Sequence, residues 1–330
     1  MKKLNFLTRL TALCLAIVFT YSCSSDDDNT QTYQPETIAE IAVASPSLSI
    51  LVQALTRADL VNTLNGAGNF TVFAPTNTAF EAFLAANDFA SVNDVPVDLL
   101  TQILLNHVID GEFASTDLST TYINTLATQA ETGYNLSMFV DTTDGVTLNG
   151  VSNVNLNLAN IDATNGIIHV VDAVIGLPTV VTFATADPNF STLVTALTEL
   201  TPNTDFVSIL SRTEEGNGDS IDPFFTVFAP LNSAFDNITI PSDETTLTTI
   251  LLHHVVSGAN AQSGDLTPNG NTTVTTLQGD DLVITLPGTS GNIADVTDGA
   301  GNSDIGIVAV DVQASNGVIH ALNKVALPNL

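Results

Sequence analysis

The chain has 330 residues, of which 35 are acidic and six are basic, giving a formal net charge of −29 at pH 7. A field of that sign repels phosphate backbones and excludes nucleic acid as a partner. Both cysteines, Cys14 and Cys23, lie close to the N-terminus, so the rest of the chain has no thiolate for catalysis or zinc and no disulfide.

The N-terminus carries the pattern of a secretory leader. Basic residues at Lys2, Lys3 and Arg9 precede an apolar run at 10–20, which is shorter than the about 20 residues that span a bilayer. We therefore predict a signal peptide over 1–22. The Ser22-Cys23 pair at its end resembles the cleavage site of bacterial lipoproteins, which implies acylation of Cys23 as a membrane anchor. An ordinary secretory leader with a chance cysteine is the alternative.

The stretch after Cys23 is polar and acidic. Residues 24–28 read Ser-Ser-Asp-Asp-Asp, and residues 23–33 have no apolar periodicity, which indicates a flexible tether. This run resembles the signal that sends lipoproteins of the Bacteroidetes group to the outer face of the outer membrane; a periplasm-facing anchor is the alternative. Removal of the leader leaves Arg57, Arg212 and Lys324 against the 35 acidic residues, a net charge of −32.

Four sequence blocks occur twice in the same order, which reveals an internal duplication. Residues 45–55, 70–75, 103–108 and 165–169 match 187–197, 225–230, 250–255 and 316–320. The second copy gains residues around 213–222, a Gly-, Asp- and Glu-rich stretch typical of a surface loop. We predict a first domain over 34–178 and a second over 179–330, joined by a very short link.

The first half of each copy reads as helical. Apolar residues at Leu48, Leu51, Val52 and Leu55 recur at helical spacing, with Pro46 in the first turn. Residues 70–73 form an expected buried strand that stops at Ala-Pro. A helix capped by Asn77 or Thr78 and another over 97–108 follow.

The second half of each copy reads as strands. Asp144-Gly145 predicts a hairpin turn, residues 151–158 alternate as a strand does, and Asn165-Gly166 predicts a tight turn into an apolar strand over 167–175. Helices followed by a largely antiparallel sheet predict an α+β fold.

The repeated blocks resemble the fasciclin-like domain. Residues 70–80 look like that family's first signature and 165–172 like its second; 225–235 and 316–322 repeat both. The resemblance covers nearly all of the chain beyond the tether. It implies a β-sandwich wedge with packed helices in each copy, and a role in cell adhesion or matrix attachment.

Four histidines match the family's motifs, and the residue before two of them does not. His107 and His254 lie where the family has a tyrosine-histidine pair, but Asn106 and His253 replace the tyrosine. Because that region is tied to integrin binding in animal relatives, the resemblance does not carry integrin-type adhesion to this chain. His169 and His320 lie inside apolar strands. We expect these six residues to be mainly structural, with an adhesion surface as the alternative. His107 and His254 are near a helix C-terminus, where the helix dipole favours a protonated ring.

The sequence contains no recognisable catalytic or cofactor motif, so we expect no enzyme, no cofactor and no metal site. A joint metal site at His253-His254 is disfavoured because adjacent helical residues point apart. Acidic loop residues suit calcium by ligand type, but none matches the EF-hand spacing and solvated loops are favoured: Glu214, Glu215, Asp219, Asp222, Asp295, Asp298 and Asp304.

These observations predict a monomeric, surface-anchored, non-enzymatic adhesion protein. Its expected partners are extracellular matrix, a cell-surface protein or a polysaccharide, with membrane contact through the lipid anchor only. A glycan-capture lipoprotein for nutrient uptake is the alternative, and a hydrolase using His107 or His254 as base is a third hypothesis.

Overall fold

The computed structural model describes residues 36–216, 218–236 and 238–330. The predicted leader, Cys23 and the tether over 23–33 lie outside the described residues.

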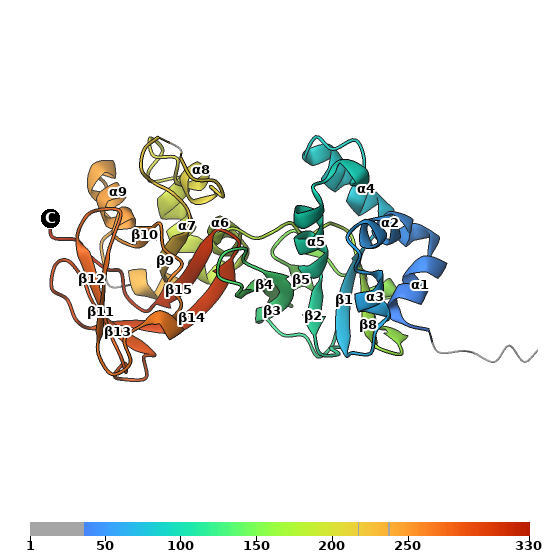
Figure 1. Cartoon of the computed structure of the whole chain (residues 1–330). Coiled ribbons are helices and arrows are strands. Elements are labelled where there is room, and N and C mark those ends of the chain that lie inside the picture. The colour runs from blue at the N-terminus through green and yellow to red at the C-terminus, as the bar shows by residue number, and fades with distance from the viewer. Residues whose placement is uncertain (1–35, 217, 237) are drawn as a thin grey trace, which may run out of the picture. The chain divides into compact units, whose positions relative to one another are not determined.

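The first half begins with short helices and ends in strands (Figure 1). Its α-helices are α1 (Ile38–Ala44), α2 (Ser49–Arg57), α3 (Val61–Asn65), α4 (Asn77–Ala86) and α5 (Val97–Leu105). Its strands are β1 (Phe70–Pro75), β2 (Val108–Asp110), β3 (Thr121–Thr128), β4 (Asn135–Asp141), β5 (Thr147–Leu148), β6 (Ser152–Asn153), β7 (Ile161–Ala163) and β8 (Gly166–Val171). Single 3-10 turns are η1 (Pro46–Leu48), η2 (Val92–Asp94) and η3 (Leu156–Leu158).

The second half repeats this order. Its α-helices are α6 (Val180–Ala186), α7 (Ser191–Thr198), α8 (Phe206–Leu210) and α9 (Glu244–Leu252), with 3-10 turns η4 (Pro188–Phe190), η5 (Asn232–Phe235) and η6 (Ser263–Asp265). Its strands are β9 (Phe225–Pro230), β10 (Val255–Ser257), β11 (Asn271–Thr275), β12 (Asp281–Thr285), β13 (Ala294–Thr297), β14 (Ile305–Ala314) and β15 (Gly317–Leu322). Where the first half has α4, the second has only the turn η5, in the region where its sequence is shorter.

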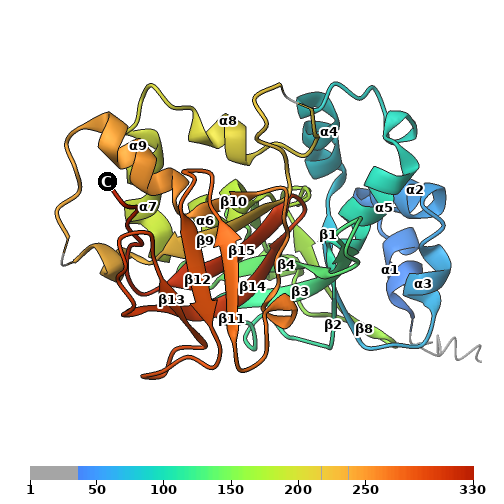
Figure 2. The same ribbon diagram turned by 60° about the vertical axis from the view of Figure 1, so that its left-hand side comes forward.

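Each half has one curled sheet. The strand order is β6-β5-β4-β3-β2-β1-β8-β7 in the first half and β10-β9-β15-β14-β13-β12-β11 in the second. Figure 2 shows the strands of the second sheet. The strands pair antiparallel except near one edge of each sheet, where β1 runs parallel to β8 and β9 parallel to β15. The predicted α+β class, repeated in two halves, is confirmed.

Side chains alternate between the two faces of β1 and of β9, and this alternation divides the core of each half into two layers. In β1, Val72 and Ala74 pack against the helices, whereas Phe73 packs with β2, β4 and β5 on the other face. In β9, Val227 and Ala229 face the helices and Phe228 the other side. The same pattern in both copies explains why the Phe-Thr-Val-Phe-Ala-Pro block is repeated.

Three sequence expectations need correction. The helix expected over 97–108 ends at Leu105, because Val108 pairs with Val72 as a strand. The strand expected over 151–158 is paired at Ser152–Asn153 and, through a single bridge to Val171, at Val154; the Asn155 side chain then accepts from Asn157 N–H and starts a 3-10 turn. Helix α4 is capped by Thr76, not by Asn77 or Thr78.

The two halves make direct contacts. Phe139 of β4 belongs to the apolar cluster of the second half, together with Phe183 and Phe190. The Tyr122 hydroxyl donates to Asp187 at 3.0 Å, and the Ser137 hydroxyl accepts from Gln313 N–H at 3.0 Å. The second half therefore completes its core with side chains from the first.

No single helix among residues 36–216, 218–236 and 238–330 is long and apolar enough to cross a bilayer; only α1 and the helical segment Pro46–Arg57, taken together across a 104° bend, reach that length and composition.

Candidate functional site

His107 and His254 make the same pair of buried hydrogen bonds. His107 Nδ1–H donates to Ile103 O at 2.7 Å, and Nε2 accepts from Ile175 N–H at 2.9 Å. His254 Nδ1–H donates to Ile250 O at 2.8 Å, and Nε2 accepts from Ala326 N–H at 3.0 Å. Each ring thus joins the end of a helix to the segment that leaves the sheet after its last strand.

This geometry requires neutral rings. Burial lowers the pKa of both His107 and His254 to about 4, against a partly opposing hydrogen bond to a backbone carbonyl. The helix dipole favours the opposite state, but it acts weakly beside the cost of desolvating a charged ring. The dipole at these helix ends therefore does not keep the rings protonated at neutral pH.

His169 and His320 form a second matched pair. His169 Nε2–H donates to Phe113 O at 2.9 Å and Nδ1 accepts from Asn160 N–H at 3.2 Å. His320 Nε2–H donates to Ala261 O at 2.9 Å, and Nδ1 accepts from Asp311 N–H at 3.4 Å. Burial lowers the pKa of both rings. Each nitrogen of these rings already has a backbone partner, so neither ring has a nitrogen available for a ligand.

The residues at the family's tyrosine position are also buried. Asn106 and His253 are both 0% exposed. Asn106 Nδ2–H donates to Gly176 O at 3.0 Å, whereas His253 lies against Thr276 Oγ1 and accepts from Gly299 N–H on Nε2. Neither side chain presents a surface to an adhesion partner in this structure.

Asn165, the asparagine of the second signature, connects the helices to the sheet through hydrogen bonds. Asn165 Oδ1 accepts from Ile38 N–H, and its Nδ2 donates to Leu64 O and Gly66 O, each at 2.8–2.9 Å. Asn316 makes the equivalent three bonds in the second half.

Steric contact explains why a glycine, Gly166 or Gly317, follows each of these asparagines. At Gly166, with φ +146°, an added Cβ would lie 2.0 Å from Phe70 O; at Gly317, with φ +159°, it would lie 2.1 Å from Phe225 O. The parallel pairing of β8 with β1 and of β15 with β9 brings these backbones together. Only glycine permits that approach.

The acidic loop residues are occupied by protein donors where the structure shows their partners. Asp219 forms a two-bond ion pair with Arg212, and Asp304 pairs with Lys324. Asp222, Asp295 and Asp298 accept from nearby amides. Across the described ranges, no group of three or more His, Cys, Asp and Glu side chains is arranged to hold a metal ion.

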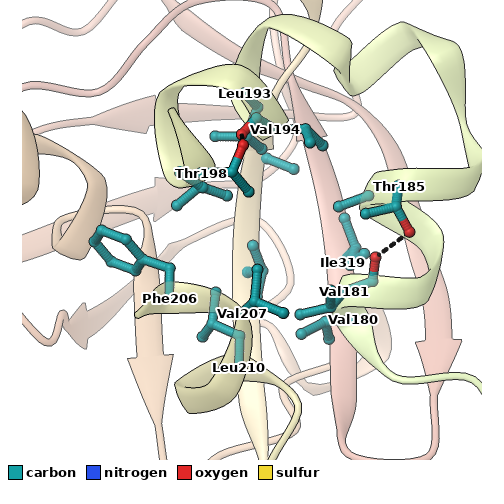
Figure 3. Close-up of a pocket in the computed structure, with 14 residues that line it drawn as sticks. Val180, Val181, Thr185, Leu193, Val194, Thr198, Phe206, Val207, Leu210 and Ile319 are labelled. Atoms are coloured by element: carbon teal, nitrogen blue, oxygen red, sulfur yellow. Dashed lines mark hydrogen bonds between the residues drawn. The ribbon is translucent and has the colours of Figure 1, made fainter. Parts of the chain in front are cut away.

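An apolar crevice lies between helices α6, α7 and α8 and the second sheet (Figure 3). Val181, Val194, Phe206 and Leu210 are among its lining residues, and its volume is about 40 Å³. Small-molecule sites occupy about 300–1,000 Å³, so this crevice is a packing gap and not a ligand site.

Two larger grooves reach that range. One, of about 380 Å³, lies where η5 replaces a longer helix and is lined mainly by apolar side chains such as Phe235, Ile250 and Leu327. The other, of about 440 Å³, lies beside α5 and the end of β3, and we call it the junction groove. Its lining residues are Phe83, Asn87, Phe89, Leu99, Gln102, Ile103, Thr128, Gln129, Ala130, Gly176, Leu177, Thr213 and Ser315.

The junction groove was not predicted from the sequence. Its lining comes from segments far apart in the chain, and of the lining residues Ile103 alone belongs to a repeated block. The motif histidines, in contrast, were found from the repeat, and the structure places each of them in the interior.

Comparison with known proteins agrees with this architecture. The family model described as "Fasciclin domain" matches residues 46–178 and 188–328. An uncharacterized protein of Synechocystis, sll1735, is 39% identical over 138 residues, covering 42% of this chain and 96% of its own. The cell surface glycolipoprotein MPB83 of Mycobacterium bovis is 32% identical over 148 residues, covering 43% of this chain and 60% of its own.

Two animal proteins align across both halves. Transforming growth factor-beta-induced protein ig-h3 of Sus scrofa is 27% identical over 279 residues, covering 81% of this chain, although the chain spans only 36% of that protein. A solved FAS1 domain pair from the insect cell adhesion molecule Fasciclin I aligns with a TM-score of 0.48 at 20% identity, covering 86% of this chain and 97% of that one. Because the family model matches most of the chain, in two successive copies, the chain belongs to the fasciclin-domain family.

Proposed function

We propose that this chain is a non-enzymatic adhesion protein, held on the outer surface of a bacterium by lipid on Cys23. Fasciclin-domain proteins act in cell adhesion and in matrix or cell-surface interaction. The proposed partners are extracellular matrix, a cell-surface protein or a polysaccharide. The domains extend over 34–178 and 179–330, and the chain acts as a monomer.

The observation that carries this proposal is the use of the motif side chains. In each of the four motif histidines, both ring nitrogens form hydrogen bonds with backbone groups: His107, His169, His254 and His320. A general base needs a ring nitrogen within reach of a substrate proton, and a metal ligand needs an uncommitted lone pair. The motif histidines therefore support a structural role in a domain that binds its partners through its surface.

Tandem domains favour adhesion through weak contacts. Once one domain of an anchored chain is bound, the second domain meets its ligand at a raised effective concentration. The acidic surface, with 35 acidic and six basic residues in the full sequence, suits partners that are neutral or cationic and a salty medium that screens self-repulsion.

The placement on the surface is tested by a matched pair of strains. Cells expressing the wild-type chain are treated with protease while intact, and a Cys23→Ala strain is fractionated alongside. We expect the wild-type protein to be membrane-bound and digested, and the variant to leave the membrane fraction. A wild-type protein that is protected until the cells are lysed would contradict surface display.

The binding role is tested on purified residues 24–330. Beads coated with this protein are mixed with matrix proteins, whole cells and polysaccharides at physiological ionic strength. Saturable retention of at least one ligand, with no cleavage of it, supports adhesion; turnover of a retained ligand would contradict it.

A further inference from the structure

We propose that the junction groove is a binding site for an uncharged glycan, organised around the side-chain amide of Gln129. This inference rests on the proposed adhesive function and names a ligand class and a place for it.

The first observation is an unpartnered amide. Gln129 is 2% exposed, lines the junction groove, and its Nε2 has no hydrogen-bond partner among the residues that the structure describes. Leaving a buried donor without an acceptor is energetically unfavourable. A ligand oxygen at the floor of the groove would supply the missing acceptor.

The orientation of this amide is fixed by its other atom. Gln129 Oε1 accepts from Glu131 N–H at 3.0 Å, from Thr132 N–H at 2.6 Å and from the Thr132 hydroxyl at 2.7 Å. Exchanging the oxygen and the nitrogen would set N–H against N–H. Nε2 is therefore turned away from the β3–β4 turn. Because the amide is already held in this orientation, binding a ligand would cost no further side-chain entropy at Gln129.

The second observation is the chemistry of the wall. All 13 lining residues are uncharged, in a chain with 35 acidic side chains. Asn87 donates its Nδ2–H to Phe83 O, and Gln102 accepts Thr128 N–H on Oε1. Asn87 Oδ1 and Gln102 Nε2 remain as an acceptor and a donor.

Donors and acceptors of this kind match sugar hydroxyls, which both donate and accept. Phe83 and Phe89 are half-buried in the same wall, and they offer apolar faces to the C–H side of a sugar ring. A wall with apolar rings and a few placed amides, without charge, fits a neutral ligand that is polar on one side and apolar on the other.

The floor of the groove is rigid. Asn106 holds Gly176 O, and Ser315 donates both its N–H and its hydroxyl to Pro178 O at 2.7 and 2.8 Å. The connection between the two halves is therefore fixed on both sides of Leu177. Preorganised groups lose little entropy when they bind.

An extended peptide is a poorer occupant. Peptides that add to a sheet need an unpaired strand edge. Where β3 borders the groove, Thr128 pairs with Asn135 of β4, and the Thr128 N–H already donates to Gln102 Oε1. A basic peptide would find no carboxylate in the lining.

The test uses purified residues 24–330 and panels of neutral gluco-, manno-, galacto- and xylo-oligosaccharides, with sulfated glycans and a peptide library as separate arms. The strongest binder is then titrated by calorimetry. We expect a neutral oligosaccharide to bind, and Gln129→Glu to weaken it at least tenfold, because this change keeps the acceptor for the turn and replaces the Nε2 donor with an oxygen.

A second variant guards against misfolding. Asn87 is exposed, so Asn87→Ala removes an acceptor from the wall without disturbing the core, and we expect a loss of three- to tenfold. Val43→Ser, on the 66% exposed Val43 of α1, is the matched control and should bind as the wild type does. Circular dichroism confirms the fold of each variant.

Binding of sulfated glycans or peptides only, or equal affinity in Gln129→Glu, Asn87→Ala and the wild type, would overturn the inference. If beads carrying the protein still attach to cells or matrix in that case, the adhesive function stands and only this site is wrong.

Discussion

His107 in the first half and His254 in the second occupy the same place in the fold. Each ring accepts a backbone N–H on Nε2, from Ile175 and Ala326, and donates from Nδ1 to the carbonyl four residues earlier in its helix. This arrangement exists only while the rings are neutral, since a protonated ring would set an N–H against the N–H of Ile175 or Ala326.

Acid should therefore weaken the fold. In the folded chain both pKa values lie at about 4, against the usual 6.5. The unfolded chain binds these protons first as the pH falls, so their contribution is complete above pH 6.5 and is lost between pH 6.5 and 4. Each ring contributes about 3 kcal/mol over that range.

The measurement is urea unfolding at pH 7 and pH 5, in 1 M salt to screen the acidic surface. We expect a clear fall in the free energy of unfolding for the wild type and a flatter profile for the His107→Gln, His254→Gln double variant. An equal slope in both proteins, or titration of both rings above pH 6 by NMR, would show that the rings are not held neutral.

Loss of Asn165 should destabilise the first half. Asn165→Ala leaves Ile38 N–H, Leu64 O and Gly66 O without their partner, at a cost of about 2–4 kcal/mol. Chemical unfolding measures the change. The exposed Asn157 provides the control, and Asn157→Ala should change stability by under about 0.5 kcal/mol. Similar effects of both variants would contradict the structural role of Asn165.

A methyl group at Gly317 should be poorly tolerated. The added Cβ would meet Phe225 O at 2.1 Å, so the parallel β9–β15 pair must separate. We expect Gly317→Ala to lower the thermal midpoint strongly or to prevent folding. Gly264→Ala, where nothing lies within 4 Å of the added Cβ, should leave the midpoint nearly unchanged. A Gly317→Ala protein as stable as the control would refute the close approach.

Phe139 should couple the two halves. Its ring lies 4.9 Å from that of Tyr122, and Phe139 packs into the second-half cluster. We expect one cooperative thermal transition for the wild type. Phe139→Ala should lose about 3–5 kcal/mol and separate the calorimetric trace into two transitions. Phe113, 37% exposed, is the control for loss of a phenylalanine. Two transitions in the wild type would mean that the halves unfold independently.

Much of this architecture could be predicted from the sequence, because the repeat identifies residues that have the same structural role in both halves. The buried strand at 70–73 and the Asn-Gly turn at 165–166 depend on local geometry, and the structure contains both, although the strand continues through Pro75. The end of the helix at Leu105 was missed because Val108 continues the apolar pattern, and only its pairing with Val72 makes it a strand.

Other features depend on contacts that no pattern records. Asn77 looks like a helix cap, but its Oδ1 accepts from Ile50 N–H in another helix. The neutral state of the His107 ring follows from burial, which outweighs the helix dipole. Gln129 lies in an ordinary polar turn of the sequence, and its unpartnered amide and its place in a groove appear only when α5, β3 and the connection at 176–177 come together.

The most direct test of the adhesive role is an attachment assay with three isogenic strains: a deletion, the deletion complemented with the wild-type gene, and the deletion complemented with Cys23→Ala. Attached cells are counted on matrix-protein, polysaccharide and cell-layer surfaces after washing. The account predicts a several-fold loss in the deletion strain on at least one surface, restored by the wild type and not by Cys23→Ala. Equal attachment of all three strains on every surface would contradict it.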